Sequence, residues 1–101
     1  MKKIINGKKY DTETAECVDS WQYSYPNDFH YVREELYQKK NGEFFLYGEG
    51  GAASCYAESV TQNERCGGEA IKPLSDDAAK EWLEQHSDAD TYEKLFGPVP
   101  E

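Results

Sequence analysis

The strongest structural signal in the chain is the stretch ELYQKKNGEFFLYGEGG, residues 35–51, in which Asn41-Gly42 separates two runs of aromatic and aliphatic residues. An Asn-Gly pair in this setting is typical of a tight β-hairpin, because both positions of a type I′ turn need positive φ. A two-residue loop here pairs Tyr37 with Leu46. Both predicted faces are then apolar, one with Tyr37, Phe44 and Leu46 and the other with Leu36, Phe45 and Tyr47. We therefore expect a strand pair buried on both sides rather than an exposed aromatic patch.

The chain before this hairpin also has an extended pattern. Asn6-Gly7 lies between Ile4-Ile5 and Tyr10, which predicts a second two-residue hairpin. We interpret residues 11–23 as a strand because of their β-branched residues, although the acidic start would also tolerate a helical turn. Pro26, Asn27 and Asp28 predict a loop.

Turn signals follow the central hairpin. Gly48, Gly50 and Gly51 lack the spacing of a phosphate-binding loop and favour a bulge or sharp turn. Gly67-Gly68 is the expected turn of a further hairpin or loop over residues 61–69. Residues 70–74 predict a last short strand that ends at Pro73.

Helical signals begin at Ser75, a good N-cap followed by two aspartates. Ala79, Trp82, Leu83 and His86 recur at helical spacing and predict the buried face. A second helix begins near Ser87 or Asp88, buries Tyr92, Leu95 and Phe96, and ends at Gly97. The sequence thus predicts one α+β domain over residues 1–101: an antiparallel β-meander of about four to five strands in residues 1–74, then two helices in residues 75–97 packed on one face.

The charge balance restricts the partners. Twenty acidic residues against eleven basic ones give a net charge of -9 and a pI near 4.6. A phosphate backbone would be repelled, so direct nucleic-acid binding is not expected, whereas a basic protein would be attracted. Solubility alone is the competing explanation of the charge. No apolar run approaches the roughly 20 residues that cross a bilayer, so we expect a protein of the bacterial cytoplasm without membrane contact.

Cysteines and histidines give no metal signature. Cys17, Cys55 and Cys66 are odd in number and lack C-x-x-C spacing, so we expect free thiols, with a Cys55–Cys66 bond as the alternative. His30 and His86 are far apart, and His86 falls on the inner face of a predicted helix. No cofactor and no metal ion are expected.

Catalytic signatures are also missing from the sequence. Glu34/Glu35 and Asp76/Asp77 are neighbours in sequence, which suits opposite strand faces or a helix start rather than an acid/base pair. We therefore expect a binding protein and not an enzyme. Scattered acids such as Asp11, Glu13 and Glu49 leave a nuclease-like site as the alternative.

The C-terminal region carries most of the negative charge. Eight acids and two lysines in residues 76–101 give -6 of the total -9. We expect this region to bind a basic protein surface, and the strand carboxylates are the second set of candidates. The predicted partner-binding residues are Asp76, Asp77, Glu81, Glu84, Asp88, Asp90 and Glu93, followed by Glu34, Glu35 and Glu49.

Four parts of the chain carry a family resemblance: INGKKYDTETA (residues 5–15), Trp21, the hairpin of residues 35–51, and IKPLSDDAAKEWLEQH with YEKLFG (residues 71–86 and 92–97). Together they resemble a family of small proteins from mobile elements of Firmicutes, phage among them, with members or relatives that are type II anti-CRISPR proteins. The resemblance implies an inhibitor of an RNA-guided effector nuclease and assigns no catalytic or binding residue.

Charge and resemblance lead to one functional prediction. An RNA-guided nuclease holds its guide and target in basic channels, which an acidic domain could occupy. We therefore expect binding to the nuclease or to its guide complex. Two alternatives remain: a regulatory interaction module of the mobile element, and a factor that depletes or damages guide RNA.

Overall fold

The computed structural model describes residues 1–25, 27–61 and 64–100. Its elements are the strands β1 (Lys2–Ile5), β2 (Lys8–Asp11), β3 (Glu16–Tyr23), β4 (Val32–Gln38), β5 (Phe44–Gly50), β6 (Glu58–Thr61), β7 (Glu64–Cys66) and β8 (Gly68–Leu74), and the helices α1 (Asp76–His86) and α2 (Ala89–Phe96). The α+β fold with two C-terminal helices is confirmed. Of the predicted loop at residues 26–28, Pro26 lies outside the described residues.

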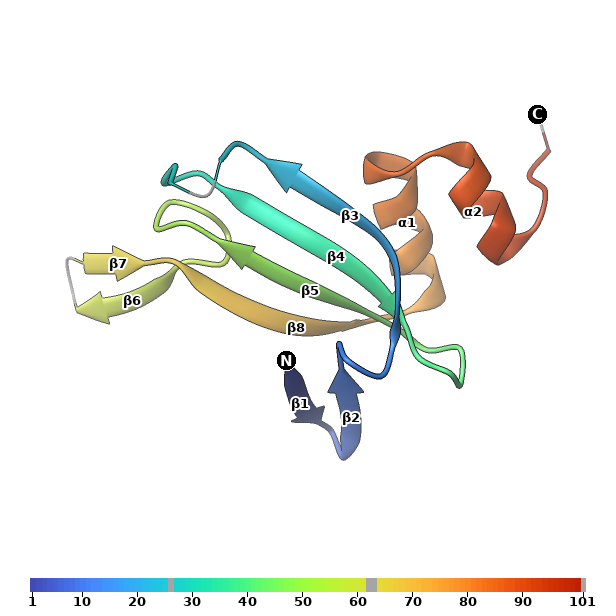
Figure 1. Cartoon of the computed structure of the whole chain (residues 1–101), viewed down its shortest axis with the longest axis horizontal. Coiled ribbons are helices and arrows are strands. Elements are labelled where there is room, and N and C mark those ends of the chain that lie inside the picture. Colours follow the sequence, from blue (N-terminus) through green and yellow to red (C-terminus); the bar gives the residue numbers. More distant parts are fainter. Residues whose placement is uncertain (26, 62–63, 101) are drawn as a thin grey trace.

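The central sheet has the strand order β3-β4-β5-β8, and every neighbouring pair is antiparallel. The pairs β1-β2 and β6-β7 form two small additional sheets. Figure 1 shows α1 and α2 beside one end of the central sheet, with the β6-β7 hairpin and the β3-β4 connection at the other end. The helices and the hairpins therefore leave part of the sheet surface free for a site.

The predicted register of the β4-β5 hairpin is wrong by one residue. Tyr37 lies opposite Phe45 and not opposite Leu46. The amide of Gly42 donates to the Lys39 carbonyl at 2.9 Å, and the amide of Lys39 donates to the Glu43 carbonyl at 2.8 Å. The loop thus has three residues, with Gly42 at φ 94°. A type I turn followed by a glycine at positive φ uses Asn-Gly as readily as a type I′ turn does, which explains the error.

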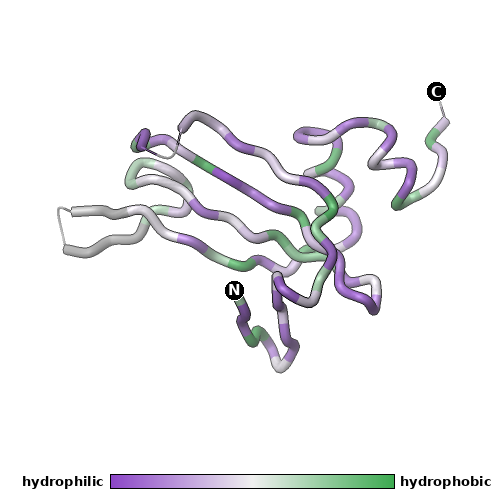
Figure 2. Tube along the Cα trace, viewed as in Figure 1, coloured by the Kyte–Doolittle hydropathy of each residue, from purple (hydrophilic) through white to green (hydrophobic). Residues whose placement is uncertain are grey.

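The corrected register divides the apolar residues between two clusters. On the helix side, Leu36, Phe44 and Leu46 pack against the helical residues Ala79, Trp82 and Leu83. On the opposite side, Tyr10 of β2 packs with Tyr37, Phe45 and Ile71. The expected burial of this strand pair on both sides is confirmed. Figure 2 shows the hydrophobic segments of β4 and β5 concentrated at the end of the sheet near the helices and the β1-β2 hairpin.

Of the turns predicted at Asn6-Gly7 and Gly67-Gly68, one is confirmed and one is wrong. Asn6 and Gly7 have φ of 52° and 76°, and Ile5 pairs with Lys8, so the N-terminal two-residue hairpin is confirmed. The predicted Gly67-Gly68 turn is wrong, because Gly67 alone separates β7 from β8. Pro73 also lies within β8, an edge strand, where a missing amide proton is tolerated.

The predicted turn at Gly48, Gly50 and Gly51 falls later in the chain. Gly48 and Gly50 belong to β5, and turns follow from residue 52. Tyr56 packs against the backbone of Gly48, where any Cβ would overlap the tyrosine ring. The glycine at position 48 thus makes room for the loop after β5.

Both helices begin as predicted, and α2 ends at the predicted glycine. The Ser75 hydroxyl accepts the Ala78 amide at 3.1 Å, Asp88 caps α2, and Gly97 ends α2 at φ 87°. The α1 residues Ala79, Trp82 and Leu83 are buried. Tyr92, Leu95 and Phe96 are only partly buried, since short α2 packs against the edge of the cluster.

The remaining predictions concern single side chains and the membrane. His86 is a packed structural histidine as expected, with its ring centroid 4.1 Å from that of Trp21. Cys17 and Cys55 are exposed free thiols, and the side chain of Cys66 lies outside the described residues. None of the described helices is long and apolar enough to span a membrane.

Candidate functional site

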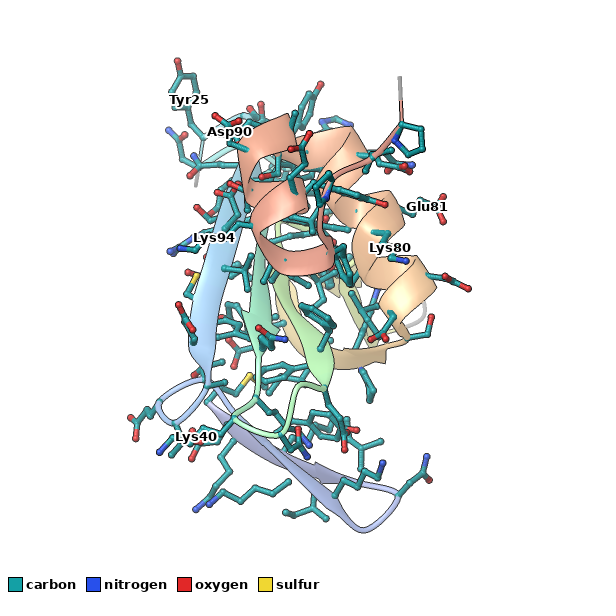
Figure 3. The ribbon with its side chains drawn as sticks, turned by 90° about the vertical axis from the view of Figure 1, so that its right-hand side faces the viewer. Tyr25, Lys40, Lys80, Glu81, Asp90 and Lys94 are labelled. Atoms are coloured by element: carbon teal, nitrogen blue, oxygen red, sulfur yellow. The ribbon has the colours of Figure 1, made fainter. Side chains whose placement is uncertain are left out.

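The acidic surface of α1, α2 and their connection is the first candidate site. All seven carboxylates predicted there are exposed: Asp76, Asp77, Glu81, Glu84, Asp88, Asp90 and Glu93. Among the described residues, none of the seven forms a salt bridge. Figure 3 shows Glu81 and Asp90 pointing away from the sheet. We call this set the acidic helical surface.

Asp88 has a structural role within this surface. Its Oδ1 accepts the Thr91 amide at 2.8 Å and so caps α2. Hydrogen bonds from the Thr91 side chain and then from its amide lower the pKa of Asp88. A substitution at Asp88 therefore weakens α2 as well as changing the charge.

Glu34 is an internal acceptor rather than a surface contact. It lies on the helix side of β4, where its Oε1 accepts the Trp82 indole at 3.2 Å and its Oε2 accepts the Tyr56 hydroxyl. Burial first, and then the hydrogen bond to Glu34, raise the pKa of Tyr56. Glu34 thus ties α1 and the loop after β5 to the sheet.

Glu35 and Glu49 lie on the opposite side of the sheet from Glu34, as expected for neighbours in a strand. Arg33 pairs with Glu35 at 3.1 Å and with Glu49 at 3.8 Å. The charge of Glu35 is the main cause that raises the pKa of Arg33. The Tyr31 hydroxyl donates to Glu49 Oε1 at 3.1 Å. These two carboxylates are already engaged within the protein.

A further carboxylate, Glu69 of β8, joins this group. Arg33, Glu49 and Glu69 lie directly opposite one another across β4, β5 and β8. The Tyr47 hydroxyl lies 2.7 Å from Glu69 Oε2 and 3.1 Å from Glu49 Oε2. Burial, followed by the hydrogen bond to Glu69, raises the pKa of Tyr47. Sequence reasoning missed Glu69 because a turn was expected at Gly67-Gly68.

The alternative nuclease-like set is spread over separate elements. Asp11 ends β2, Glu13 follows it in a turn, and Glu49 is in β5 beside Arg33. The Glu13 amide donates to Asp11 Oδ1 at 3.0 Å. In the part of the chain that the structure describes, no group of three or more His, Cys, Asp or Glu side chains could hold a metal ion.

Most of the lysines lie away from the acidic helical surface. Six of the eleven basic residues lie in β1, β2 and the β4-β5 turn: Lys2, Lys3, Lys8, Lys9, Lys39 and Lys40. Figure 3 shows Lys40 and Asp90 at opposite ends of that view. The molecule therefore has separate acidic and basic regions, which its net charge alone does not reveal.

Comparison of the chain with protein-family models, with curated proteins and with solved structures gives no match. The structure shows which chemical groups the two candidate regions present at the surface. The acidic helical surface presents carboxylates to solvent, and the row of Arg33, Glu49 and Glu69 presents a hydrogen-bonded polar network. Each of these regions contains more carboxylates than cationic groups.

Proposed function

We propose that this protein inhibits a type II RNA-guided effector nuclease by binding a basic, nucleic-acid-handling surface of the nuclease or its guide complex. The contact surface is the acidic helical surface. Seven exposed carboxylates without salt bridges among the described residues are the observation that carries this proposal. A basic channel that normally holds nucleic acid has the complementary charge.

The mode of action is occupation of a surface and not chemistry. Carboxylates that form no salt bridge among the described residues remain able to attract a basic partner, and the attraction steers association over about a Debye length. Nucleic acid that competes for the same channel would be displaced. The choice of an RNA-guided nuclease as the target rests on the resemblance of residues 5–15, 35–51 and 71–86 to the mobile-element family.

A capture and cleavage experiment tests the proposed function. The tagged protein is incubated with a type II effector loaded with guide RNA, and co-elution, target cleavage and guide integrity are measured. We expect co-elution, inhibition that saturates near equimolar ratio, and an intact guide. A shortened guide at substoichiometric protein would support the guide-damaging alternative instead. Absence of both binding and inhibition across a panel of effectors would leave the regulatory-module alternative.

A pair of charge reversals identifies the surface. Glu81→Lys with Glu84→Lys changes the net charge by the same amount as Glu13→Lys with Glu16→Lys, and all four side chains are exposed. We expect the helical pair to slow association about tenfold at low salt, with a smaller effect at high salt. The control pair should change it much less. Equal effects of both pairs would mean that only net charge matters. Asp88 is left intact because it caps α2.

A further inference from the structure

Three aromatic side chains stand exposed at the end of the sheet farthest from the helices. Tyr23 is 56% exposed, Tyr25 75% and Phe29 71%, and all belong to β3 or its connection to β4. Figure 3 shows Tyr25 projecting from the molecule. Exposed aromatic side chains are enriched at protein interaction sites. Of these three, Phe29 also lines a groove.

Described residues of the β3–β4 connection form hydrogen bonds with one another and with the next loop. The Ser24 hydroxyl donates to Asp28 Oδ2 at 2.6 Å, and the His30 amide donates to Asp28 Oδ1 at 2.8 Å. The Ala53 amide donates to the Phe29 carbonyl at 2.7 Å and fastens the loop to the next one. Ser24 has φ 65°, a conformation that a residue other than glycine adopts only when its surroundings impose it. The backbone that carries Phe29 thus loses little freedom on binding a partner.

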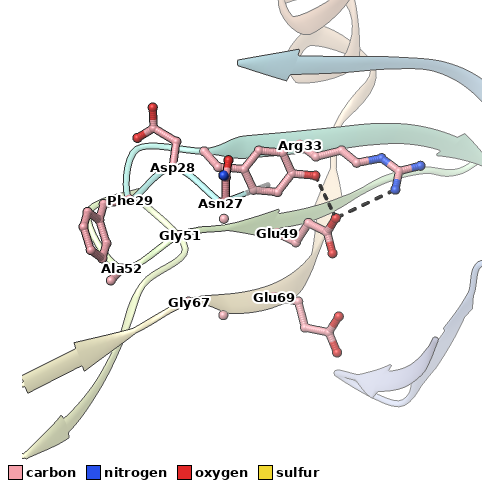
Figure 4. Close-up of a pocket in the computed structure, with 12 residues that line it drawn as sticks. Asn27, Asp28, Phe29, Arg33, Glu49, Gly51, Ala52, Gly67 and Glu69 are labelled. Carbon is pink, nitrogen blue, oxygen red and sulfur yellow. Dashed lines mark hydrogen bonds and ion pairs between the residues drawn. The ribbon is translucent and has the colours of Figure 1, made fainter. Parts of the chain in front are cut away.

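A groove of about 980 Å³ begins beside Phe29 and runs over the side of the sheet opposite the helices. Figure 4 shows Phe29 at one end of this groove and the side chains of Arg33, Glu49 and Glu69 at the other. The glycines at the ends of β5 and β8 also line it. An extended segment with side chains on one face would fit such a groove.

The net negative charge of the groove favours a positively charged ligand. Its lining contains three carboxylates, from Asp28, Glu49 and Glu69, and one guanidinium, from Arg33. The Tyr47 hydroxyl lies within hydrogen-bond distance of both Glu49 and Glu69, but it has one proton to donate. Glu49 Oε1 already accepts from Tyr31 and pairs with Arg33, whereas Glu69 Oε1 has no partner among the described residues and can accept from a donor of a partner protein. A phosphate group would be repelled by the same carboxylates.

We propose that this end of the sheet docks an arginine-bearing extended segment of a basic protein. The guanidinium of one arginine donates to Glu69, beside Glu49, and the side chain of a second arginine packs on Phe29 at the other end of the groove. Arginine fits better than lysine because its planar fork of donors serves two carboxylate oxygens and stacks on an aromatic ring. This inference deepens the proposed function by giving the same class of partner a second contact, remote from the acidic helical surface.

A peptide titration tests the inference without any nuclease, so its failure is separate from a failure of the proposed function. The probe is a capped peptide of three Arg-Gly repeats, titrated into the isotope-labelled full chain while amide shifts are followed by NMR. We expect saturable shifts at Phe29, Arg33, Glu49 and Glu69, and several-fold weaker binding of the matching Lys-Gly peptide. Shifts centred on the acidic helical surface, or none that saturate, would overturn the inference.

Two matched variants sharpen the result. Glu69→Gln should weaken peptide binding about threefold to tenfold, because it removes a charge-assisted acceptor. Glu84→Gln removes an equal charge from the acidic helical surface and should change the binding less than twofold. Equal losses in both variants would show unspecific charge attraction and contradict the proposal.

Phe29→Ala supplies a second, uncharged test, and its fold should be retained because the ring is exposed. We expect weaker peptide binding with an unchanged amide spectrum elsewhere. Unchanged binding would overturn the role of the aromatic group. Concentration-dependent shifts at the same residues in the peptide-free protein would show that a second copy occupies the surface, and would also contradict the proposal.

Discussion

The contact between Gly48 and Tyr56 shows how one missing side chain organises a loop. Gly48 is buried in β5, and a Cβ there would overlap the Tyr56 ring. The tyrosine in turn donates its hydroxyl to Glu34, which also accepts from Trp82. One glycine thus allows the loop after β5, the strand β4 and helix α1 to share a carboxylate.

Gly48→Ala should therefore destabilise the protein by about 1 to 3 kcal/mol, because the ring must move and Glu34 loses a donor. Denaturant unfolding measures the loss. In the background Tyr56→Ala, the same glycine substitution should cost much less, since the ring is gone. An additive double variant would contradict the proposed contact.

Turn geometry determines the pairing of β4 and β5. Gly42 has φ 94° and nothing within 4 Å of an added Cβ, so a substitution there acts through backbone strain alone. Gly42→Ala should cost about 1 kcal/mol, and Gly42→Asn should cost less because asparagine tolerates positive φ better. The denaturant midpoints of the three proteins check this order. An alanine variant as stable as the parent would show that the loop relaxes to another turn.

Sequence patterns predicted the elements better than their pairing. The period of Ala79, Trp82 and Leu83 identified the buried face of α1, because a helix has one period and one face. The Asn41-Gly42 signal predicted a hairpin but not its register, because two loop types use the same dipeptide. A shift of one residue moves every side chain to the other face of a strand.

The two candidate sites also differ in how far the sequence could predict them. The acidic helical surface was predictable because exposed charges on a helix follow from its period. The row of Arg33, Glu49 and Glu69 depends on the register of three strands, one of which, β8, is distant in sequence from the other two, so no local pattern indicates it. The aromatic group of Tyr23, Tyr25 and Phe29 was interpreted only as part of a strand and loop.

At the scale of the whole molecule, tyrosines hydrogen-bonded to carboxylates occur on both sides of the central sheet. Tyr56 donates to Glu34 on the helix side, while Tyr31, Tyr37 and Tyr47 donate to carboxylates on the other side. Burial, reinforced by the neighbouring carboxylates, raises the pKa of each of these four hydroxyls, for Tyr37 to about 12. The folded state therefore holds these protons more tightly than the unfolded chain.

This difference predicts alkaline unfolding with a defined direction. An unfolded tyrosine loses its proton near pH 10.0, whereas folded Tyr37 keeps it until about pH 12. Above pH 10 the folded state thus binds more protons, so the free energy of unfolding is at its full value below pH 10 and falls as the pH rises toward 12. For Tyr37 the loss is on the order of 1 to 2 kcal/mol, after allowance for its partly solvated surroundings.

Tyr37→Phe keeps the ring that stacks on Phe45 and removes the ionisable hydroxyl, so its stability should decline less between pH 10 and 12. Denaturant unfolding across this range, with tyrosinate absorbance recorded in parallel, measures both quantities; identical pH profiles for the variant and the parent would show that Tyr37 does not contribute.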